Sequence, residues 1–386
     1  MESRWVRWVG PGLIAIGAVG SIATATLGAG QRPWEPPPCG SGVSGMTASV
    51  TVAAPTSPSD LAQQPWYRLD PIVDRAGELQ SQRISMGLDG LRSVRTLELP
   101  AESFVAGPFG RIVLVGGDDG TTSRLRAIDV TGGCSWSLAE ESAVIRRATM
   151  DAAGLNMYEM RVDRESRADL GIWQRPVDGS RQPVRILEPI APDARFGRTY
   201  STEFTWDLSG RTLAVQSCGE SACRTRVVDP AGGGPVQTVA EPDLGTLVAL
   251  DGTTMVSYAA CPGLPCPIVA LDLRSKARRT LADAAIAAVA ITTPDGPRLI
   301  HETFDETGVA LRDLSLDGAS TTDLGHLPAG LRLHAIPTIA QAATLLPSGW
   351  VLLASDGRLP LDGPDAQTQL RHIPDGSAVQ LDEVAR

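Results

Sequence analysis

Lysine, histidine and aromatic residues are all scarce in this chain of 386 residues. Aromatics make up 4% of the sequence, there are four histidines, and Lys276 is the only lysine. The formal net charge is −10. An extended nucleic-acid surface needs a basic stripe that neutralises phosphates, and no such stripe is visible. The sequence therefore predicts no nucleic-acid partner.

The short motifs of several enzyme classes are also missing. The sequence contains no Gly-x-Ser-x-Gly elbow, no P-loop, no His-Glu-x-x-His and no EF-hand loop. Glycine (40) and proline (29) are abundant instead, which indicates many turns. The chain is too long for one ordinary core of about 150 residues, so its length favours a barrel or a repeat array.

The N-terminal 30 residues resemble a targeting segment. Arg4 and Arg7 precede a stretch without charge from Val9 to Gly30, and tryptophans flank it. Basic residues ahead of an apolar run direct the following chain across the membrane. We expect a signal-anchor that spans the membrane through residues 9–30. The alternatives are a signal peptide cleaved near Ala23-Thr24-Ala25, which would leave a secreted protein, and a buried helix of a cytoplasmic protein.

The remainder of the chain divides into a linker and one large domain. Residues 31–65 hold seven prolines among Gly, Ser, Thr and Ala, which predicts an extended spacer. Residues 66–386 form the domain, which we expect to lie outside the cytoplasm at the cell membrane.

The six cysteines agree with export. An even number in an exported chain predicts disulfides, and a four-thiolate zinc site is the alternative. Two pairs have Cys-x4-Cys spacing, and two cysteines remain to pair by elimination, with intermolecular pairing left open. The three sets are Cys218 with Cys223, Cys261 with Cys266, and Cys39 with Cys134.

A repeat determines the predicted architecture. A turn that ends in glycine and leads into an apolar strand recurs at intervals of 42 to 56 residues, and further short strands with acidic turns follow each one. Four strands per repeat of this length is the pattern of a propeller blade. We predict an all-β propeller with seven blades, or six as the alternative. The turn glycines are Gly110, Gly154, Gly210, Gly252, Gly296 and Gly349.

Two of these turns carry a family resemblance. Trp206-Asp207-Leu208-Ser209-Gly210 and Thr293-Pro294-Asp295-Gly296 resemble the "SPDG" signature of TolB-like, WD40-like propellers of the PD40 type. The resemblance covers nearly the whole chain after residue 66, although the motif is short and structural. It implies a scaffold for binding a protein or a ligand. TolB has an additional N-terminal domain, and only the linker stands in its place here, so TolB's partners do not carry over.

The loops between the second and third strands of all blades emerge on one face, which makes them the expected binding face. Both Cys-x4-Cys pairs lie there, as hairpin staples that either stiffen a binding loop or resist proteolysis. A connection rich in arginine and aromatic residues joins the same face. The candidate binding residues are Arg195, Phe196, Arg198, Tyr200, Asp163, Glu165 and Asp169.

Acidic residues in these loops would form either a negative rim, suited to a cation such as calcium or to a basic partner, or an ordinary solvated surface. His301, Asp305 and Glu306 are weak candidates for a metal or acid–base site. On a strand, His301 and Thr303 would face one side and Glu302 the other, so the cluster does not converge by itself. No cofactor is predicted. The sequence favours a non-catalytic binding propeller at the cell envelope. The alternatives are a metal-dependent hydrolase or lactonase acting at the central channel, and a structural part of an envelope complex.

Overall fold

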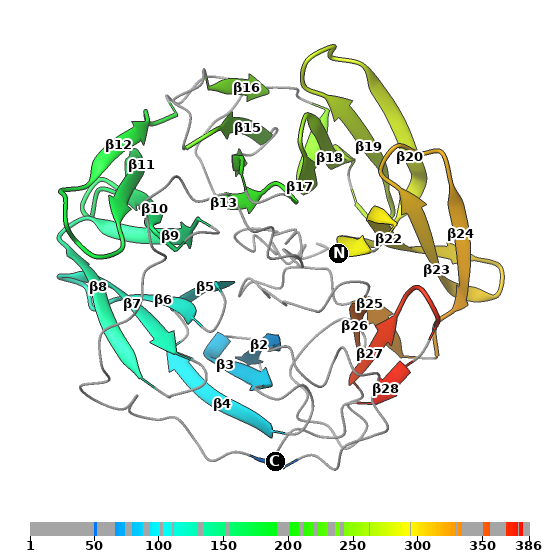
Figure 1. Cartoon of the computed structure of the whole chain (residues 1–386), viewed down its shortest axis with the longest axis horizontal. Coiled ribbons are helices and arrows are strands. Elements are labelled where there is room, and N and C mark those ends of the chain that lie inside the picture. The colour runs from blue at the N-terminus through cyan, green and yellow to red at the C-terminus, as the bar shows by residue number, and fades with distance from the viewer. Residues whose placement is uncertain are drawn as a thin grey trace, which may run out of the picture.

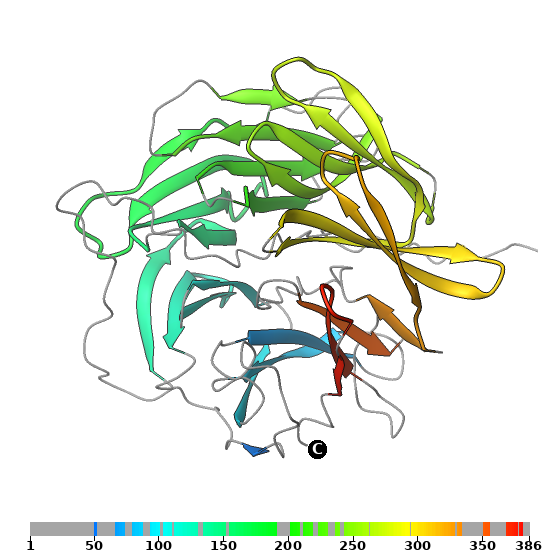
Figure 2. The same cartoon turned by 45° about the vertical axis from the view of Figure 1, so that its right-hand side comes forward.

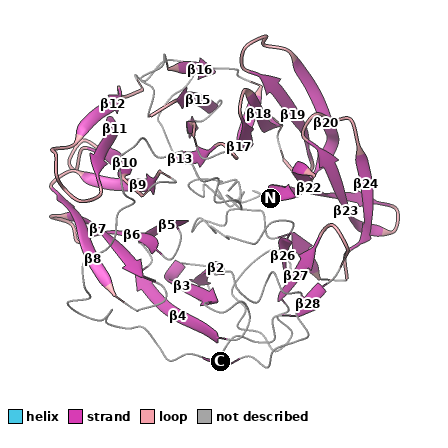
Figure 3. Cartoon of the chain, viewed as in Figure 1, coloured by secondary structure: helices cyan, strands magenta, loops and turns pink. Residues whose placement is uncertain are grey.

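The computed structural model describes the chain in segments. These are residues 50–51, 66–73, 79–87, 93–100, 103–109, 112–129, 134–151, 154–190, 201–208, 211–218, 223–230, 236–239, 243–261, 263–293, 295–328, 330–333, 350–355, 368–376 and 378–380. Regular structure in these segments is entirely β (Figure 3). None of these described segments contains a helix long and apolar enough to span a membrane. The expected anchor, residues 9–30, lies outside the described residues.

The described strands form seven four-stranded antiparallel sheets, which we number in chain order. Sheet 1 contains β1 (Val50–Thr51), β2 (Trp66–Val73), β3 (Leu79–Gly87) and β4 (Ser93–Pro100). Sheet 2 contains β5 (Phe104–Phe109), β6 (Ile112–Asp118), β7 (Ser123–Asp129) and β8 (Ser135–Glu141). Sheet 3 contains β9 (Val144–Met150), β10 (Asn156–Val162), β11 (Asp169–Pro176) and β12 (Val184–Leu187). Sheet 4 contains β13 (Ser201–Trp206), β14 (Leu213–Cys218), β15 (Cys223–Val228) and β16 (Gln237–Val239).

The last three sheets follow the same plan. Sheet 5 contains β17 (Leu244–Asp251), β18 (Thr254–Ala259), β19 (Cys266–Asp272) and β20 (Arg278–Ala285). Sheet 6 contains β21 (Ala287–Thr293), β22 (Gly296–Asp305), β23 (Gly308–Ser315) and β24 (Thr321–His326). Sheet 7 contains β25 (Leu331–Leu333), β26 (Trp350–Ser355), β27 (Thr368–His372) and β28 (Ala378–Gln380).

The sheets stand around a common axis like the blades of a propeller (Figures 1 and 2). In sheets 2 to 7 the four strands are neighbours in chain order, with the first strand toward the axis. The predicted all-β propeller is therefore confirmed. Antiparallel order also places every loop between second and third strands on one face, as predicted.

The repeated acidic turn closes the hairpin between first and second strands. Asp207 Oδ1 accepts hydrogen bonds from the backbone N–H groups of Arg211 (2.7 Å) and Thr212 (3.0 Å). Asp151 does the same for Leu155 (2.8 Å) and Asn156 (3.2 Å). The carboxylate satisfies backbone donors that the tight turn leaves unpaired. The acidic residue in the SPDG-like turn thus has a local structural role.

The hydrophobic core lies between neighbouring sheets. Each cluster of buried side chains joins two sheets in succession, from sheets 2 and 3 round to sheets 6 and 7. Between sheets 2 and 3, for example, Leu114 and Leu125 pack against Met150 and Met157. A single sheet cannot bury both of its faces, so stability depends on the stacked neighbours.

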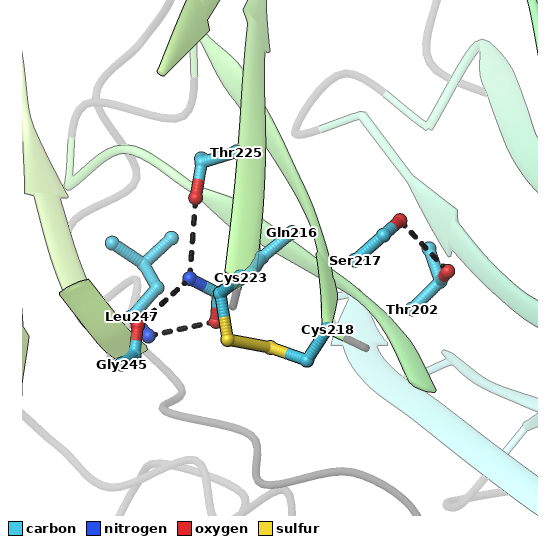
Figure 4. The surroundings of a disulfide bond; sticks show 8 residues. All are labelled: Thr202, Gln216, Ser217, Cys218, Cys223, Thr225, Gly245 and Leu247. Atoms are coloured by element: carbon cyan, nitrogen blue, oxygen red, sulfur yellow. Dashed lines mark hydrogen bonds between the residues drawn. A yellow bond between two sulfur atoms is a disulfide. The ribbon is translucent and has the colours of Figure 1, made fainter. Parts of the chain in front are cut away.

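A hydrogen bond from the backbone also connects neighbouring sheets, at the boundaries between sheets 4 and 5, 5 and 6, and 6 and 7. The residue six positions after the turn glycine accepts a hydrogen bond from the backbone of the next sheet's first strand. Gln216 Oε1 accepts from the N–H of Leu247 at 2.8 Å, and its Nε2 donates to Gly245 O at 3.1 Å (Figure 4). The equivalent Tyr258 hydroxyl is hydrogen-bonded to the backbone of Ala288, and Glu302 Oε1 accepts from the N–H of Leu333. These contacts fix the spacing of sheets 4 to 7.

The first sheet corrects one detail of the predicted domain division. Its outer strand is β1, which pairs with β4 through Val50 opposite Val94 and Thr51 opposite Ser93. Residues 50–51 lie within the predicted 31–65 linker, so part of that segment belongs to the propeller. Backbone pairing at the open edge of β4 stabilises this arrangement although the local sequence is weak in strand signals. No sheet in the described segments combines strands from both ends of the chain.

Candidate binding face

The loops between second and third strands, here called the 2–3 loops, are the predicted binding face. In sheets 4 and 5 each of these loops is closed by a disulfide, Cys218–Cys223 and Cys261–Cys266, as predicted. Figure 4 shows the first of these two bonds. Cys134 is disulfide-bonded as well. Cys39 lies outside the described residues, so its pairing with Cys134 remains a prediction.

Aspartate side chains cap the 2–3 loops of sheets 2, 3 and 6. Asp119 Oδ1 accepts hydrogen bonds from the N–H groups of Thr121 (2.9 Å) and Thr122 (2.8 Å). In the next loop Asp163 Oδ1 accepts from Ser166, and in sheet 6 Asp305 Oδ1 accepts from the N–H of Thr307 at 2.8 Å. Each such turn replaces flexible loop backbone with a fixed local geometry.

The caps also explain the charge state of these aspartates. Hydrogen bonds from the side chain and backbone of Thr307 lower the pKa of Asp305 to about 2. Backbone hydrogen bonds of Thr122 lower the pKa of Asp119, and the Ser166 hydroxyl lowers that of Asp163. Donors inside each loop favour the ionised carboxylate. These carboxylates are ionised but turned toward their own loops.

The described acidic residues of these loops bond to backbone groups or lie exposed and do not converge on one point. Asp169 Oδ1 accepts from the N–H of Gly171 at 2.7 Å, and its Oδ2 accepts from the N–H of Ile190 at 3.0 Å. Glu165 is exposed at its loop tip. No group of three or more His, Cys, Asp or Glu suited to a metal ion occurs within the described part of the chain.

A salt bridge links the 2–3 loops of two neighbouring sheets. Arg164 of sheet 3 forms a bidentate pair with Asp118 of sheet 2, at 2.8 and 2.9 Å, and its Nε donates to Ser142 O at 3.0 Å. Hydrogen bonding to Arg164 lowers the pKa of Asp118. The paired fork geometry fixes both loops relative to each other. The sequence pattern did not indicate this contact, because the two residues are far apart in the chain.

The structure separates the weak metal candidates. His301 is 3% exposed on β22, where burial and the charge of Arg312 lower its pKa to about 4. Asp305 and Glu306 lie beyond it, at the exposed hairpin. The four residue steps along the strand from His301 to Asp305 correspond to about 13 Å between their Cα atoms. One metal ion cannot be shared across that distance.

A cluster not anticipated from the sequence lies at this same hairpin. His326 Nε2 is 2.6 Å from the Thr307 hydroxyl and 2.8 Å from Asp305 Oδ2. A hydroxyl, an imidazole and a carboxylate in contact suggest nucleophilic catalysis, but that requires the two imidazole nitrogens to serve different partners. Here both partners share Nε2. The arrangement closes the hairpin and does not form a proton relay.

Apolar side chains are exposed on this face. Among the described residues, four large hydrophobic side chains are exposed: Leu264, Phe304, Val184 and Val236. Leu264 (54% exposed) is inside the disulfide loop of sheet 5, and Phe304 (59% exposed) adjoins the 2–3 loop of sheet 6. The two valines are on or beside outer strands. The predicted hot spot Arg195, Phe196, Arg198 and Tyr200 lies outside the described residues.

The mouth of the axis on the same face is lined by the starts of the first strands. On β9, Arg146 is exposed and Arg147 is partly buried. Arg147 Nε lies 3.4 Å from Glu203 Oε2 on β13, and Arg147 Nη1 donates to Arg146 O at 2.8 Å. Burial raises the pKa of Glu203 to about 7, although the positive charge of Arg147 opposes the rise.

Sheets 2 and 3 share a buried ionic network. Glu159 is fully buried and contacts Arg161 (2.7 Å) and Arg175 (2.6 Å), and both arginines also contact Glu141 at the end of β8. The Arg161 guanidinium lies 4.9 Å from the centre of the Trp173 ring. Two positive and two negative groups balance each other at this junction.

Comparison with known proteins identifies only the fold. No family model and no curated protein sequence matches. A prolyl endopeptidase structure aligns with 78% of this chain and 46% of its own at 11% identity, with a TM-score of 0.53. Oligopeptidase B from Leishmania major aligns with 83% of this chain and 49% of its own at 10% identity, with a TM-score of 0.50. This chain thus corresponds to about half of each peptidase.

Two other structures are similar. The propeller domain of the Trilobed protease from Pyrococcus furiosus, described as having an open velcro topology, aligns over 84% of this chain and 96% of its own at 11% identity, with a TM-score of 0.51. TolB from Acinetobacter baumannii aligns over 74% of this chain and 66% of its own, with 12% identity and a TM-score of 0.43. At the level of the fold, the chain is a β-propeller similar to these proteins.

Proposed function

We propose that this protein is a non-catalytic, extracytoplasmic β-propeller that binds a protein or another ligand at the cell envelope through its 2–3 loop face. The observation that carries the proposal is the capping of five consecutive 2–3 loops, in sheets 2 to 6. A loop that is already fixed loses less conformational entropy when a partner binds. Such a face needs no cofactor.

Two further observations support this surface and location. Leu264 and Phe304 supply exposed apolar area beside the fixed loops, as the core of an interface requires. Disulfides persist in oxidising compartments, which supports a position outside the cytoplasm. The proposal includes seven blades, an anchor or signal in residues 9–30, and a Cys39–Cys134 bond that ties the N-terminal segment to sheet 2.

The test is site-specific photo-crosslinking in intact cells. A photoreactive amino acid replaces Leu264 or Glu165 on the 2–3 loop face. Matched controls carry it at Ser180 or Arg274, which are exposed in hairpins between third and fourth strands, on the opposite face. We expect discrete crosslinked products from the first pair and none from the controls. Equal yields from both faces, or products from the controls alone, would contradict the proposal.

A further inference from the structure

The hairpin between the third and fourth strands of sheet 5 concentrates positive charge in a chain whose net charge is −10. It joins β19 to β20, and four of the six residues from 274 to 279 are basic: Arg274, Lys276, Arg278 and Arg279. All four are exposed, and Lys276 is the only lysine of the chain. The hairpin lies at the edge of the molecule in two views (Figures 1 and 2). Antiparallel strand order places it on the face opposite the 2–3 loops.

The two basic side chains at the tip of this hairpin carry unpaired charge. Within the described part of the chain, neither Arg274 nor Lys276 forms an ion pair. Nearer the base of the hairpin, Arg278 contacts Asp243, and Arg279 donates a hydrogen bond to a backbone carbonyl of sheet 6. The tip therefore presents positive charge that no carboxylate of the described chain neutralises.

The backbone of the turn fixes the geometry of the tip. Asp272 Oδ1 accepts hydrogen bonds from the N–H and the hydroxyl of Ser275, at 2.6 and 2.7 Å. Lys276 donates its N–H to Asp272 O at 2.9 Å. The carboxylate of Asp272 is thus occupied by its own turn, and the turn loses little conformational freedom when the tip meets another surface.

Lys276 has a backbone conformation that favours glycine. Its φ is 61°, and Gly376 takes the equivalent position in sheet 7 with a φ of 71°. Each donates its N–H to the carbonyl oxygen four positions earlier, at 2.9 Å. The left-handed conformation destabilises a residue with a Cβ relative to glycine. The turn of sheet 5 therefore holds a lysine where glycine fits better, as expected of a side chain that has a function.

We propose that this basic hairpin docks on the anionic phospholipid headgroups of the membrane that the proposed anchor, residues 9–30, spans. The inference rests on the proposed position at the cell envelope and adds a second contact surface to it. A projecting tip has no walls to enclose a small anion, so it suits an extended charged surface. Segments with four or more basic residues bind anionic bilayers, and each such residue contributes roughly a fivefold gain in binding.

The anchor and the spacer make a weak contact sufficient. A tethered domain stays at a high effective concentration near the bilayer, so a single hairpin with four basic residues can hold it there. Docking through the hairpin leaves the 2–3 loops on the opposite face accessible to a partner. The two contacts are therefore compatible with each other.

The chain contains the same turn on the opposite face, which provides a matched control. In the 2–3 loop of sheet 3, Arg167 donates its N–H to Asp163 O at 3.0 Å and has a φ of 59°. Ala168 follows Arg167 as Ala277 follows Lys276, and both alanines are exposed. Probes at these two alanines compare the two faces from the same local geometry.

Photo-crosslinking of the full-length chain to lipid vesicles tests the contact. A photoreactive amino acid replaces Ala277 or Ala168, the vesicles contain phosphatidylcholine with or without phosphatidylglycerol, and mass spectrometry measures the lipid adducts. We expect adducts at Ala277 on the anionic vesicles, at least fivefold fewer on the neutral ones, and few at Ala168 on either. K276G should reduce the adducts at Ala277 about fivefold and R274Q/K276G further, whereas R167G should leave them unchanged. Circular dichroism confirms that each variant is folded.

Three results would overturn the membrane contact. These are equal adduct yields at Ala277 and Ala168, equal yields on anionic and neutral vesicles, and an unchanged yield in R274Q/K276G. Discrete protein products from Ala277 in intact cells would also overturn it and assign the hairpin to an acidic protein. Lipid adducts do not form such products, so Arg274 remains a valid control for Leu264. Crosslinks from Leu264 that persist when the hairpin fails these tests would retain the binding face and reject only the membrane contact.

Discussion

The pH dependence of stability offers a sharp test, because the chain contains its own control. Glu302 and Gln216 occupy equivalent positions, six residues after their turn glycines, and each accepts a backbone N–H from the next sheet. Burial raises the pKa of Glu302 from 4.5 to about 7, and the hydrogen bond from Leu333 and the charge of Arg332 oppose the rise only in part. Glutamine accepts the same hydrogen bond without a charge.

The sign and size of the pH-dependent change in stability follow from thermodynamic linkage. A carboxyl whose pKa is higher in the folded state stabilises the fold fully below its unfolded pKa, and this contribution is lost as pH rises from about 4.5 through 7. Each pKa unit is worth about 1.4 kcal/mol, so a rise from 4.5 to about 7 corresponds to an upper limit of about 3 kcal/mol. For a domain of this size that is about 4 °C in Tm.

The assay is thermal unfolding of the wild type and E302Q at pH 5 and pH 8. We expect similar Tm values at pH 5 and a higher Tm for E302Q at pH 8. The reverse change, Q216E, should lower the Tm more at pH 8 than at pH 5. It also removes the amide donor to Gly245 at both pH values, so only the pH-dependent part is informative. An E302Q variant that is less stable than the wild type at pH 8 would refute the reasoning, because it would mean that Arg332 stabilises an ionised Glu302.

Three further changes test the packing and the caps. The C218S/C223S pair should lower the free energy of unfolding by about 2 kcal/mol, because the closed loop is short, and reducing agent should then have less effect than on the wild type. E159Q should cost about 3–5 kcal/mol in chemical denaturation, because it removes the buried one of the two carboxylates that Arg161 and Arg175 share; a cost below 1 kcal/mol would show that the network is solvated. G116A should destabilise by about 1–3 kcal/mol, because a Cβ there would lie 2.0 Å from a phenylalanine ring, whereas G117A on the same strand meets nothing within 4 Å. Equal Tm values for these two glycine variants would contradict the packing.

The propeller was predictable because its signal is local and repeated. Turn glycines and acidic turns recur along the chain, and each repeat specifies hairpins through contacts within a few residues. The Cys-x4-Cys staples were predictable for the same reason. Strand β1 was not predictable, because this two-residue strand forms only by pairing with the edge of β4, about forty residues later in the chain.

The site was predictable only in its position on the fold. The repeated four-stranded blade placed the 2–3 loops on one face, but the sequence could not show that Asp119, Asp163 and Asp305 turn inward to cap their own loops. Long-range contacts were also invisible in the pattern. Arg164 reaches Asp118 in another sheet, and Arg147 meets Glu203 across two first strands. Such pairs depend on how neighbouring sheets stack.

Hydroxyl-radical footprinting of the full-length chain tests the central claim most directly. The chain contains a matched set of exposed apolar side chains, with Leu264 and Phe304 at the 2–3 loop face and Val184 and Val236 at the outer strands. Labelling is compared between intact cells and the purified protein. The account predicts that Leu264 and Phe304 are protected in cells while the two valines are labelled equally in both. Protection of the valines alone, or of none of the four residues, would contradict a binding function for the 2–3 loop face.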